Sequence, residues 1–298
     1  MEEKGLRELE NRWVRECAPG CTARCPVHVD VEAMIAAMCA GDFAGAAAIF
    51  QKKVPFPGIV SLVCDQPCQE VCQRTGIDAT VSIRSLERAA LNHSSPQEIS
   101  IRPLPAKPKK VAVVGAGLSG LTAVLKLTQK GYRITLFEAS FSLGGSVWDH
   151  PKTSLPRKVI KKDFEIVRNL PIRFRLGTVL GRDFTLSDLE EDYDAVYLGV
   201  GAGFTWLEQI EKDESGRVKA HPITFQTGRP GVFASGSLLQ ETGRTSQIRS
   251  ISYGQRAAIS IDRYLRRVSL TAPRQLRGPC ATSLLSPVAG KEPRPSLR

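Results

Sequence analysis

The chain has 298 residues, of which 42% are hydrophobic and 24% charged, a globular composition that excludes a mostly disordered or collagen-like chain. No apolar run approaches the roughly 18–20 residues of a membrane helix, and the charged N-terminus lacks the apolar core of a signal peptide. The formal net charge is +11, and between Asp262 and Arg298 eight Lys and Arg residues face two Asp and Glu residues. No nucleic-acid-binding module accompanies this basic tail. We therefore expect a cytoplasmic protein without membrane or nucleic-acid partners.

Cysteines dominate the N-terminal region. Seven of the eight lie within the first 72 residues, and six of these form two evenly spaced groups: Cys17, Cys21 and Cys25, then Cys64, Cys68 and Cys72. Clustered thiols in a chain without an export signal indicate metal or redox chemistry rather than disulfides. Iron–sulfur clusters take about four thiolate ligands, and a Cys-Pro pair such as Cys25-Pro26 often ends a ligand run. The spacing favours iron–sulfur and leaves structural zinc open.

Two helices are expected between the cysteine groups. Asp30 is placed to cap a helix over residues 31–40, and Asp42 a second helix over residues 43–50. Cys39 falls inside the first of these runs, where we expect a buried apolar thiol. These runs and the cysteine groups together predict a helical domain over residues 1–93.

The composition changes after this domain. Residues 94–110 contain four prolines and three lysines and predict an extended linker. Residues 111–270 alternate strand-like and helix-like runs, which predicts an α/β domain and makes the whole chain an α+β multidomain protein. Residues 271–298 are expected to form a disordered basic tail, and Cys280 within it is assigned no role.

The α/β region opens with a dinucleotide-binding pattern. A short apolar strand leads into Gly115-x-Gly117-x-x-Gly120, a helix runs to about Lys130, and a second strand ends at Glu138. In this context the glycines permit a tight turn, close approach of a pyrophosphate and packing of the helix on the sheet. The helix N-terminus favours phosphates, and Glu138 stands near the usual offset of a carboxylate that binds ribose hydroxyls.

The loop alone does not choose between FAD and NAD, but the residues that follow favour FAD. Gly144 and Gly145 come just after the second strand, where a flavin-binding fold passes its chain close to the cofactor. Residues 193–202 and 230–237 read as strands that end in small residues, and a Rossmann-like domain is completed by a helix over about 247–266. The residues expected to contact the cofactor are Gly115, Gly117, Ser119, Gly120, Glu138, Gly144, Gly145, Leu180, Gly201, Gly236, Ser237 and Ile248.

Five segments carry a family resemblance: ARCPVHVDV (23–31), PFPGIVSLVCDQPCQEVC (55–72), VSIRSLER (81–88), the glycine-rich loop and GVFASGS (231–237). In this order they resemble the small subunit of glutamate synthase and its relatives, including the N-terminal part of dihydropyrimidine dehydrogenase. The resemblance implies a helical domain with two [4Fe-4S] clusters, followed by an FAD domain that an NAD(P)H domain interrupts. It also implies electron transfer from NAD(P)H through FAD and the clusters to a partner.

The resemblance further implies the metal ligands. One cluster would use Cys25, Cys64 and Cys68, with Glu87 as a polar fourth ligand. The other would use Cys17, Cys21 and Cys72. The family usually has one more cysteine shortly before Cys17, which this chain lacks, so the second cluster has three visible ligands.

Three further departures from the family concern the flavin domain. Ser154 stands where the family often has arginine, and Ser237 where its aspartate binds the ribityl chain of FAD. Only 27 residues, 203–229, separate the two halves of the FAD domain, whereas a domain needs roughly 50 or more. We therefore expect the NAD(P)H-binding domain to be missing.

These observations predict an FAD- and [4Fe-4S]-containing oxidoreductase subunit that exchanges electrons with a larger oxidoreductase or a ferredoxin-like partner. The cofactors carry the chemistry, so no catalytic side chain is assigned. Two alternatives remain open. One is a self-sufficient NAD(P)H-dependent oxidoreductase, and the other is a non-catalytic interaction protein left by loss of the NAD(P)H domain.

Overall fold

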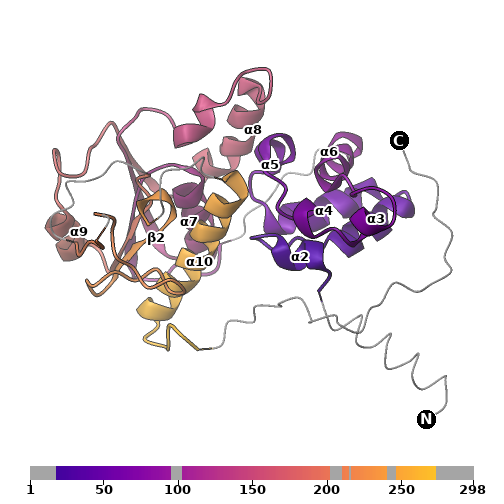
Figure 1. Ribbon diagram of the computed structural model, residues 1–298. Helices are drawn as coiled ribbons and strands as arrows, with labels where there is room; N and C mark the ends of the chain where they lie inside the picture. The colour runs from indigo at the N-terminus through magenta and orange to yellow at the C-terminus, as the bar shows by residue number, and fades with distance from the viewer. Residues whose placement is uncertain (1–17, 95–102, 202–209, 215, 240–245, 273–298) are drawn as a thin grey trace, which may run out of the picture. The chain divides into compact units, whose positions relative to one another are not determined.

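The computed structural model describes residues 18–94, 103–201, 210–214, 216–239 and 246–272 (Figure 1). Their contacts divide them into two units. The first contains residues 18–53 and 65–94, and the second contains residues 54–64 and the described residues from 103 onwards. Within these described residues, no helix has the length and apolarity needed to cross a membrane.

The first unit is helical. Its elements are α2 (Gly20–Arg24), α3 (Val31–Cys39), α4 (Phe43–Lys53), η1 (Gln69–Val71), η2 (Gln73–Gly76) and α6 (Ile83–His93). Helix α4 packs against both α3 and α6. Its buried residues are Ala46, Ala47 and Phe50, and the two alanines let the helix backbones come close.

The sequence signals at the starts of α3 and α4 are confirmed. Asp30 accepts a hydrogen bond from Ala33 N at 3.1 Å, and Asp42 accepts one from Gly45 N at 2.7 Å. The expectation of a buried thiol at Cys39 is wrong, because this residue is the last of α3 and is exposed there.

The second unit contains a five-stranded parallel sheet in the order β3-β2-β1-β4-β5. The strands are β1 (Lys110–Val114), β2 (Arg133–Glu138), β3 (Arg173–Leu176), β4 (Ala195–Leu198) and β5 (Val232–Ala234). Strand β1 lies at the centre, where Val113 is paired with Leu136 on one side and Tyr197 on the other. The chain runs from β1 outwards to β2 and β3 and then crosses back to β4 on the other side of β1. In such sheets ligands bind beyond the carboxyl ends of the strands at this switch point.

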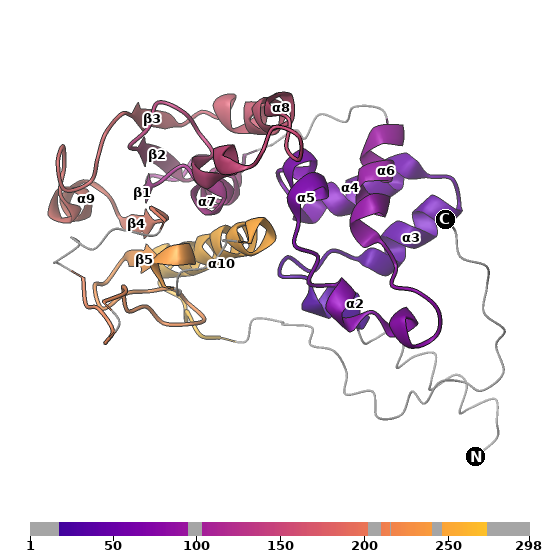
Figure 2. The same ribbon diagram turned by 45° about the horizontal axis from the view of Figure 1, so that its top comes forward.

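Helices cover the sheet. They are α7 (Leu118–Gln129), η3 (Gly145–Asp149), α8 (Arg157–Arg168), α9 (Leu186–Asp192), η4 (Gly236–Leu238) and α10 (Gln247–Leu265). Helix α7 is buried on nearly every side, since α10 packs along it as Figure 2 shows. The predicted strand–helix–strand unit and the C-terminal helix are therefore confirmed within one or two residues of their expected ends.

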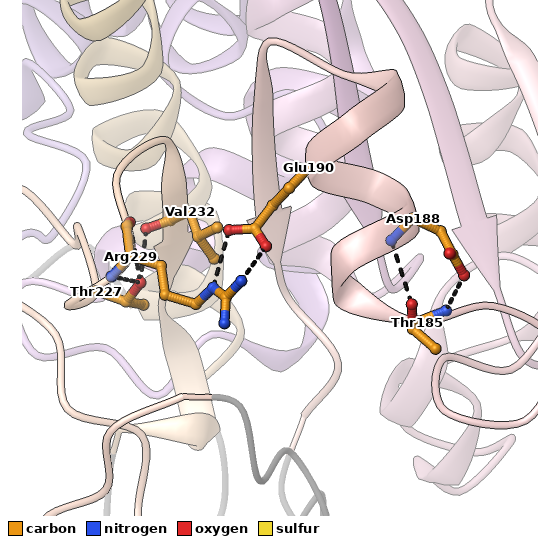
Figure 3. A network of polar contacts seen from close by, with 6 residues as sticks. All are labelled: Thr185, Asp188, Glu190, Thr227, Arg229 and Val232. Atoms are coloured by element: carbon orange, nitrogen blue, oxygen red, sulfur yellow. Dashed lines mark hydrogen bonds and ion pairs between the residues drawn. The ribbon is translucent and has the colours of Figure 1, made fainter.

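Residues 210–230 lead back to β5 through isolated antiparallel bridges rather than a strand–helix–strand unit. Figure 3 shows how their end is fixed: Arg229 forms an ion pair with Glu190 of α9, and the Thr227 hydroxyl donates to Val232 O at 3.1 Å. Helix α9 itself begins with a capping box in which Thr185 and Asp188 bond each other's backbone N–H groups. This part of the second unit thus leads directly into β5, the edge strand of the sheet.

Helix α5 (Pro57–Val63) belongs to the second unit, although the sequence analysis places it in the helical domain. The Phe56 ring meets Phe164 of α8 edge to face, with centroids 5.5 Å apart. Asp163 accepts hydrogen bonds from Ile59 N at 2.7 Å and from Gly58 N at 3.3 Å. The carboxylate therefore satisfies backbone donors that the first turn of α5 leaves open.

This partly buried carboxylate makes the stability of the protein depend on pH. Burial raises the pKa of Asp163 from its ordinary 3.8 to about 7, although the two N–H donors and Lys162 pull it down. Between about pH 4 and 7 the folded protein thus binds a proton that the unfolded chain has lost, so this contribution to the free energy of unfolding falls as pH rises. Between these pH values, the free energy of unfolding of the wild type should fall by on the order of a few kcal/mol more than that of Asp163→Asn.

Urea unfolding at several pH values measures this difference. The exposed Asp192, replaced by asparagine, is the matched control, and its curve should stay parallel to that of the wild type. A pH dependence of Asp163→Asn equal to that of the wild type would show that Asp163 does not titrate in this range.

Candidate cofactor sites

The loop between β1 and α7 has the geometry of a phosphate cradle. Gly115 has φ +101, and a Cβ at this position would collide with the carbonyl oxygen of Gly199. Gly117 is the N-cap of α7 with φ −68 and ψ 173, and a Cβ there would meet no atom within 4 Å. The first glycine is thus required by the turn, whereas the second borders open space at a helix N-terminus, where phosphate oxygens bind favourably.

The double glycine after β2 lies along this cradle. Gly144 N donates to Ala116 O at 2.7 Å, and Gly144 and Gly117 form an isolated parallel bridge. A Cβ on Gly145 would come within 3.4 Å of Gly117 Cα. These two glycines therefore lie directly beside the glycine-rich loop.

Glu138 ends β2 beside the same loop. One carboxylate oxygen accepts from Ala116 N at 2.6 Å, and the other accepts from Ser140 N at 2.9 Å. A carboxylate offers about four acceptor positions. Glu138 therefore supports the cradle and keeps capacity for ribose hydroxyls.

A buried chain of hydroxyls underlies the cradle. The Tyr197 hydroxyl of β4 bonds both Ser119 of α7 and Ser235 at the end of β5, the latter at 2.5 Å. Burial raises the pKa of Tyr197, although both serine bonds oppose the shift. The phenol therefore stays neutral and ties three elements together behind the phosphate loop. Ser119, expected from the sequence to contact the cofactor, has this structural role as well.

Removal of the central hydroxyl should weaken the fold. Tyr197→Phe leaves Ser119 and Ser235 without their shared partner, and buried hydroxyls that lose a partner cost about 1–3 kcal/mol. Urea unfolding measures the loss. Tyr193→Phe, on a partly buried tyrosine that precedes β4, is the control and should change the free energy of unfolding by less. Equal effects of the two variants would contradict a special role for this hydroxyl chain.

The remaining expected contacts divide into two kinds. Gly201 follows β4 with φ +85, and Gly236 follows β5 with φ +81, so both lie past the carboxyl ends of strands. Leu180 and Ile248 are 3% and 2% exposed, so their side chains belong to the core and only their backbones could reach a ligand. The side chain of Ser237 lies outside the described residues.

Arg157 is a residue that the sequence analysis missed. Its guanidinium lies 5.3 Å from the ring of Trp148, and the Trp148 indole donates to Leu143 O, next to the double glycine. Among the described residues, the buried Nη1 of Arg157 has no hydrogen-bond partner. An orphaned buried donor of this kind marks a position where a ligand oxygen or a water is expected. In the sequence, the signal that could have drawn attention to Arg157 is Trp148, which follows closely after Gly144 and Gly145.

The first unit brings together cysteines from both groups. Cys21 lies in α2 and Cys25 caps its end, while Cys68 and Cys72 flank η1. Helix α2 and η1 are in contact, and Arg24 pairs with Glu70 at 2.8 Å across them. Cys25 and Cys68 are buried, whereas Cys21 and Cys72 are partly exposed.

The electrostatic couplings show which of these groups are neighbours. Burial raises the pKa of Cys68 to about 12, with further increases from Cys25 and Glu87. Burial also raises the pKa of Cys25, to which Glu87 adds, and burial raises that of Cys21, to which Cys72 adds. Burial raises the pKa of Glu87 to about 8, while Arg84 lowers it. Cys25, Cys68 and Glu87 therefore lie close enough to influence one another, while Cys21 is coupled to Cys72 and also to Cys68.

Two expected ligands are placed differently. Cys17 lies outside the described residues, and Cys64 caps the end of α5 in the second unit. In the described ranges, no three His, Cys, Asp or Glu side chains converge on a point that would hold a single metal ion.

Comparison with known proteins finds a family model for the helical N-terminal region and another for the start of the α/β region. Residues 5–99 match the family model described as dihydropyrimidine dehydrogenase domain II, 4Fe-4S cluster, and residues 113–159 match an NAD(P)-binding Rossmann-like domain. The chain is 31% identical over 219 residues to the NADPH-Fe(3+) oxidoreductase subunit beta of Geobacter sulfurreducens, covering 71% of this chain and 33% of that protein.

Two further relatives show the same pattern. The NADP(+)-dependent formate dehydrogenase subunit beta of Moorella thermoacetica is 32% identical over 61% of this chain and 29% of its own length. The glutamate synthase [NADPH] small chain of Escherichia coli is 31% identical over 68% of this chain and 44% of its own length. The chain therefore spans less than half the length of these relatives. The predicted resemblance is confirmed, and the chain is a homologue of the glutamate synthase small chain and related oxidoreductase subunits.

Proposed function

We propose that this chain is an electron-transfer oxidoreductase subunit with FAD on its α/β unit and one or two [4Fe-4S] clusters. The observation that carries the proposal is that a dinucleotide cradle and two converging cysteine groups occur in one chain. The homologues, which are oxidoreductase subunits, support the reaction class. Bound FAD would supply the transfer of single electrons to or from a cluster.

The residues of the α/β unit would bind and orient FAD. The open face of Gly117 would admit the pyrophosphate to the N-terminus of α7, where backbone N–H groups are free to donate. The remaining acceptor positions of Glu138 would bind ribose hydroxyls. The Gly144-Gly145 turn lies beside this loop, because Gly144 is bridged to Gly117. This double glycine just after β2 is the feature on which we base the choice of FAD over NAD(P)H at the loop.

The cysteines would hold the clusters. We propose Cys25, Cys64, Cys68 and Glu87 as one ligand set and Cys17, Cys21 and Cys72 as the other. Buried thiols with raised pKa values bind metal only as they lose their protons, so cluster insertion would release protons. A carboxylate beside three thiolates would give the first set one harder ligand in place of the usual fourth cysteine.

We propose that electrons enter or leave through a partner. The short connection over residues 203–229 and its isolated bridges leave no strand–helix–strand unit for a second nucleotide in the described residues. A larger oxidoreductase or a ferredoxin-like protein is the partner that this arrangement needs. The Geobacter and Moorella relatives are themselves named as beta subunits.

Anaerobic visible absorption tests the proposal. The full chain, reconstituted with FAD, iron and sulfide, should show flavin bands on a broad iron–sulfur absorption. NADPH added to this protein should bleach the flavin slowly or not at all, because the nucleotide domain is missing. Rapid bleaching would support the self-sufficient alternative. A chain that stays colourless would support the non-catalytic interaction protein and contradict the proposal.

A further inference from the structure

Helix α5 has a partly buried carboxylate at its N-terminus and a candidate metal ligand at its C-terminus. Asp163 of α8 accepts the N–H groups of Gly58 and Ile59, while Cys64 caps the other end and donates its own N–H to Val60 O at 3.0 Å. The helix has 7 residues, so the two ends lie about 10 Å apart. A displacement at the first turn is therefore transmitted to the thiol with little loss.

The first turn of α5 is held mainly by α8. Pro57 at the start of the helix has no N–H, so Gly58 and Ile59 supply the first donors, and Asp163 accepts both. A Cβ on Gly58 would come within 2.8 Å of Val159 Cγ1, which shows how closely the two helices approach. The Phe56–Phe164 ring contact lies beside these bonds. The Ser61 hydroxyl also donates to Gly58 O at 3.0 Å, but this bond uses a carbonyl of the turn and leaves both N–H groups to Asp163.

We propose that Asp163 is a positioning residue for Cys64, because it anchors the helix that ends at this thiol. The inference rests on the proposed function, in which Cys64 is a cluster ligand. Groups that orient a metal ligand typically change metal affinity 10–100-fold when they are removed. Loss of the carboxylate frees two backbone donors at a buried helix end, so α5 shifts on α8 and the thiol leaves its position.

Iron retention tests the proposal in the reconstituted full chain. Asp163→Ala should lose iron to a chelator at least about tenfold more readily than the wild type, with its FAD content unchanged. Its reduced-state electron paramagnetic resonance spectrum should change as well. Asp163→Asn keeps one acceptor oxygen and should recover most of the wild-type iron retention. Asp188→Ala removes a capping carboxylate from α9 in the same unit and should retain iron like the wild type.

A double-variant cycle separates positioning from general loosening. In a Cys64→Ser background, Asp163→Ala should cause no further loss of iron, whereas independent effects would multiply. If the alanine variant does not fold, Asp163→Leu fills a similar volume and still removes both acceptors. Wild-type iron retention and spectrum in the folded Asp163 variants would overturn the inference alone. A wild type that retains no iron would overturn the proposed function, and the inference with it.

Discussion

A valine at position 117 should abolish FAD binding and leave the fold intact. Gly117 has backbone angles that valine adopts readily, and a Cβ there meets no protein atom within 4 Å. The space that valine would fill is the space through which a pyrophosphate approaches the N-terminus of α7. We expect FAD affinity to fall at least about 100-fold, which corresponds to about 2.7 kcal/mol.

Flavin fluorescence titration and thermal unfolding measure the two halves of this prediction. Gly76→Val is the matched control, because Gly76 also faces open space and lies in the other unit. It should bind FAD as the wild type does. Gly120→Val should instead damage the fold, since a Cβ on Gly120 would collide with the carbonyl oxygen of Gly115. FAD binding by Gly117→Val at wild-type affinity would contradict the proposed cradle.

A serine at position 68 should remove one cluster. Cys68 is buried and interacts with Cys25 and Glu87, which makes it a central member of its set. Serine is isosteric but replaces a soft thiolate with a hard oxygen, which iron–sulfur clusters accept poorly. Iron and sulfide should fall by about half if two clusters form and almost completely if only this one forms. Elemental analysis after reconstitution measures the iron and sulfide bound per chain.

Cys39→Ser is the control for this loss. The thiol of Cys39 is exposed at the end of α3 and belongs to neither cysteine group. Its replacement should leave the iron content, the visible absorption and the thermal stability unchanged. Equal iron losses from the two serine variants would mean that iron binds to thiols nonspecifically, and the assigned ligand sets would then be wrong.

Local sequence signals predicted much of this structure because their causes are local. The β1–α7–β2 unit follows from apolar runs and a glycine pattern, and the caps at Asp30 and Asp42 follow from side chains three residues from their donors. Gly144 follows β2 closely in the sequence, and one backbone hydrogen bond, to Ala116 O, holds it beside the phosphate loop.

The features that sequence could not predict depend on contacts distant along the chain. Asp163 lies 104 residues from Ile59, so no local pattern indicates that α5 joins the α/β unit. The Tyr197 hydroxyl meets Ser119 and Ser235 only after the sheet has formed. Cys39 was expected to be buried because it lies in an apolar run, but the helix ends there and the thiol is exposed.

Photoreduction of the reconstituted chain, followed by electron paramagnetic resonance, tests the central claim most directly. The claim is that FAD and the [4Fe-4S] clusters of this chain exchange electrons. Illumination of the flavin under anaerobic conditions, with a sacrificial electron donor such as EDTA, should produce the signal of a reduced cluster, and Gly117→Val, which lacks FAD, should give none under the same light. A wild-type flavin that bleaches while its clusters remain oxidised would contradict the account.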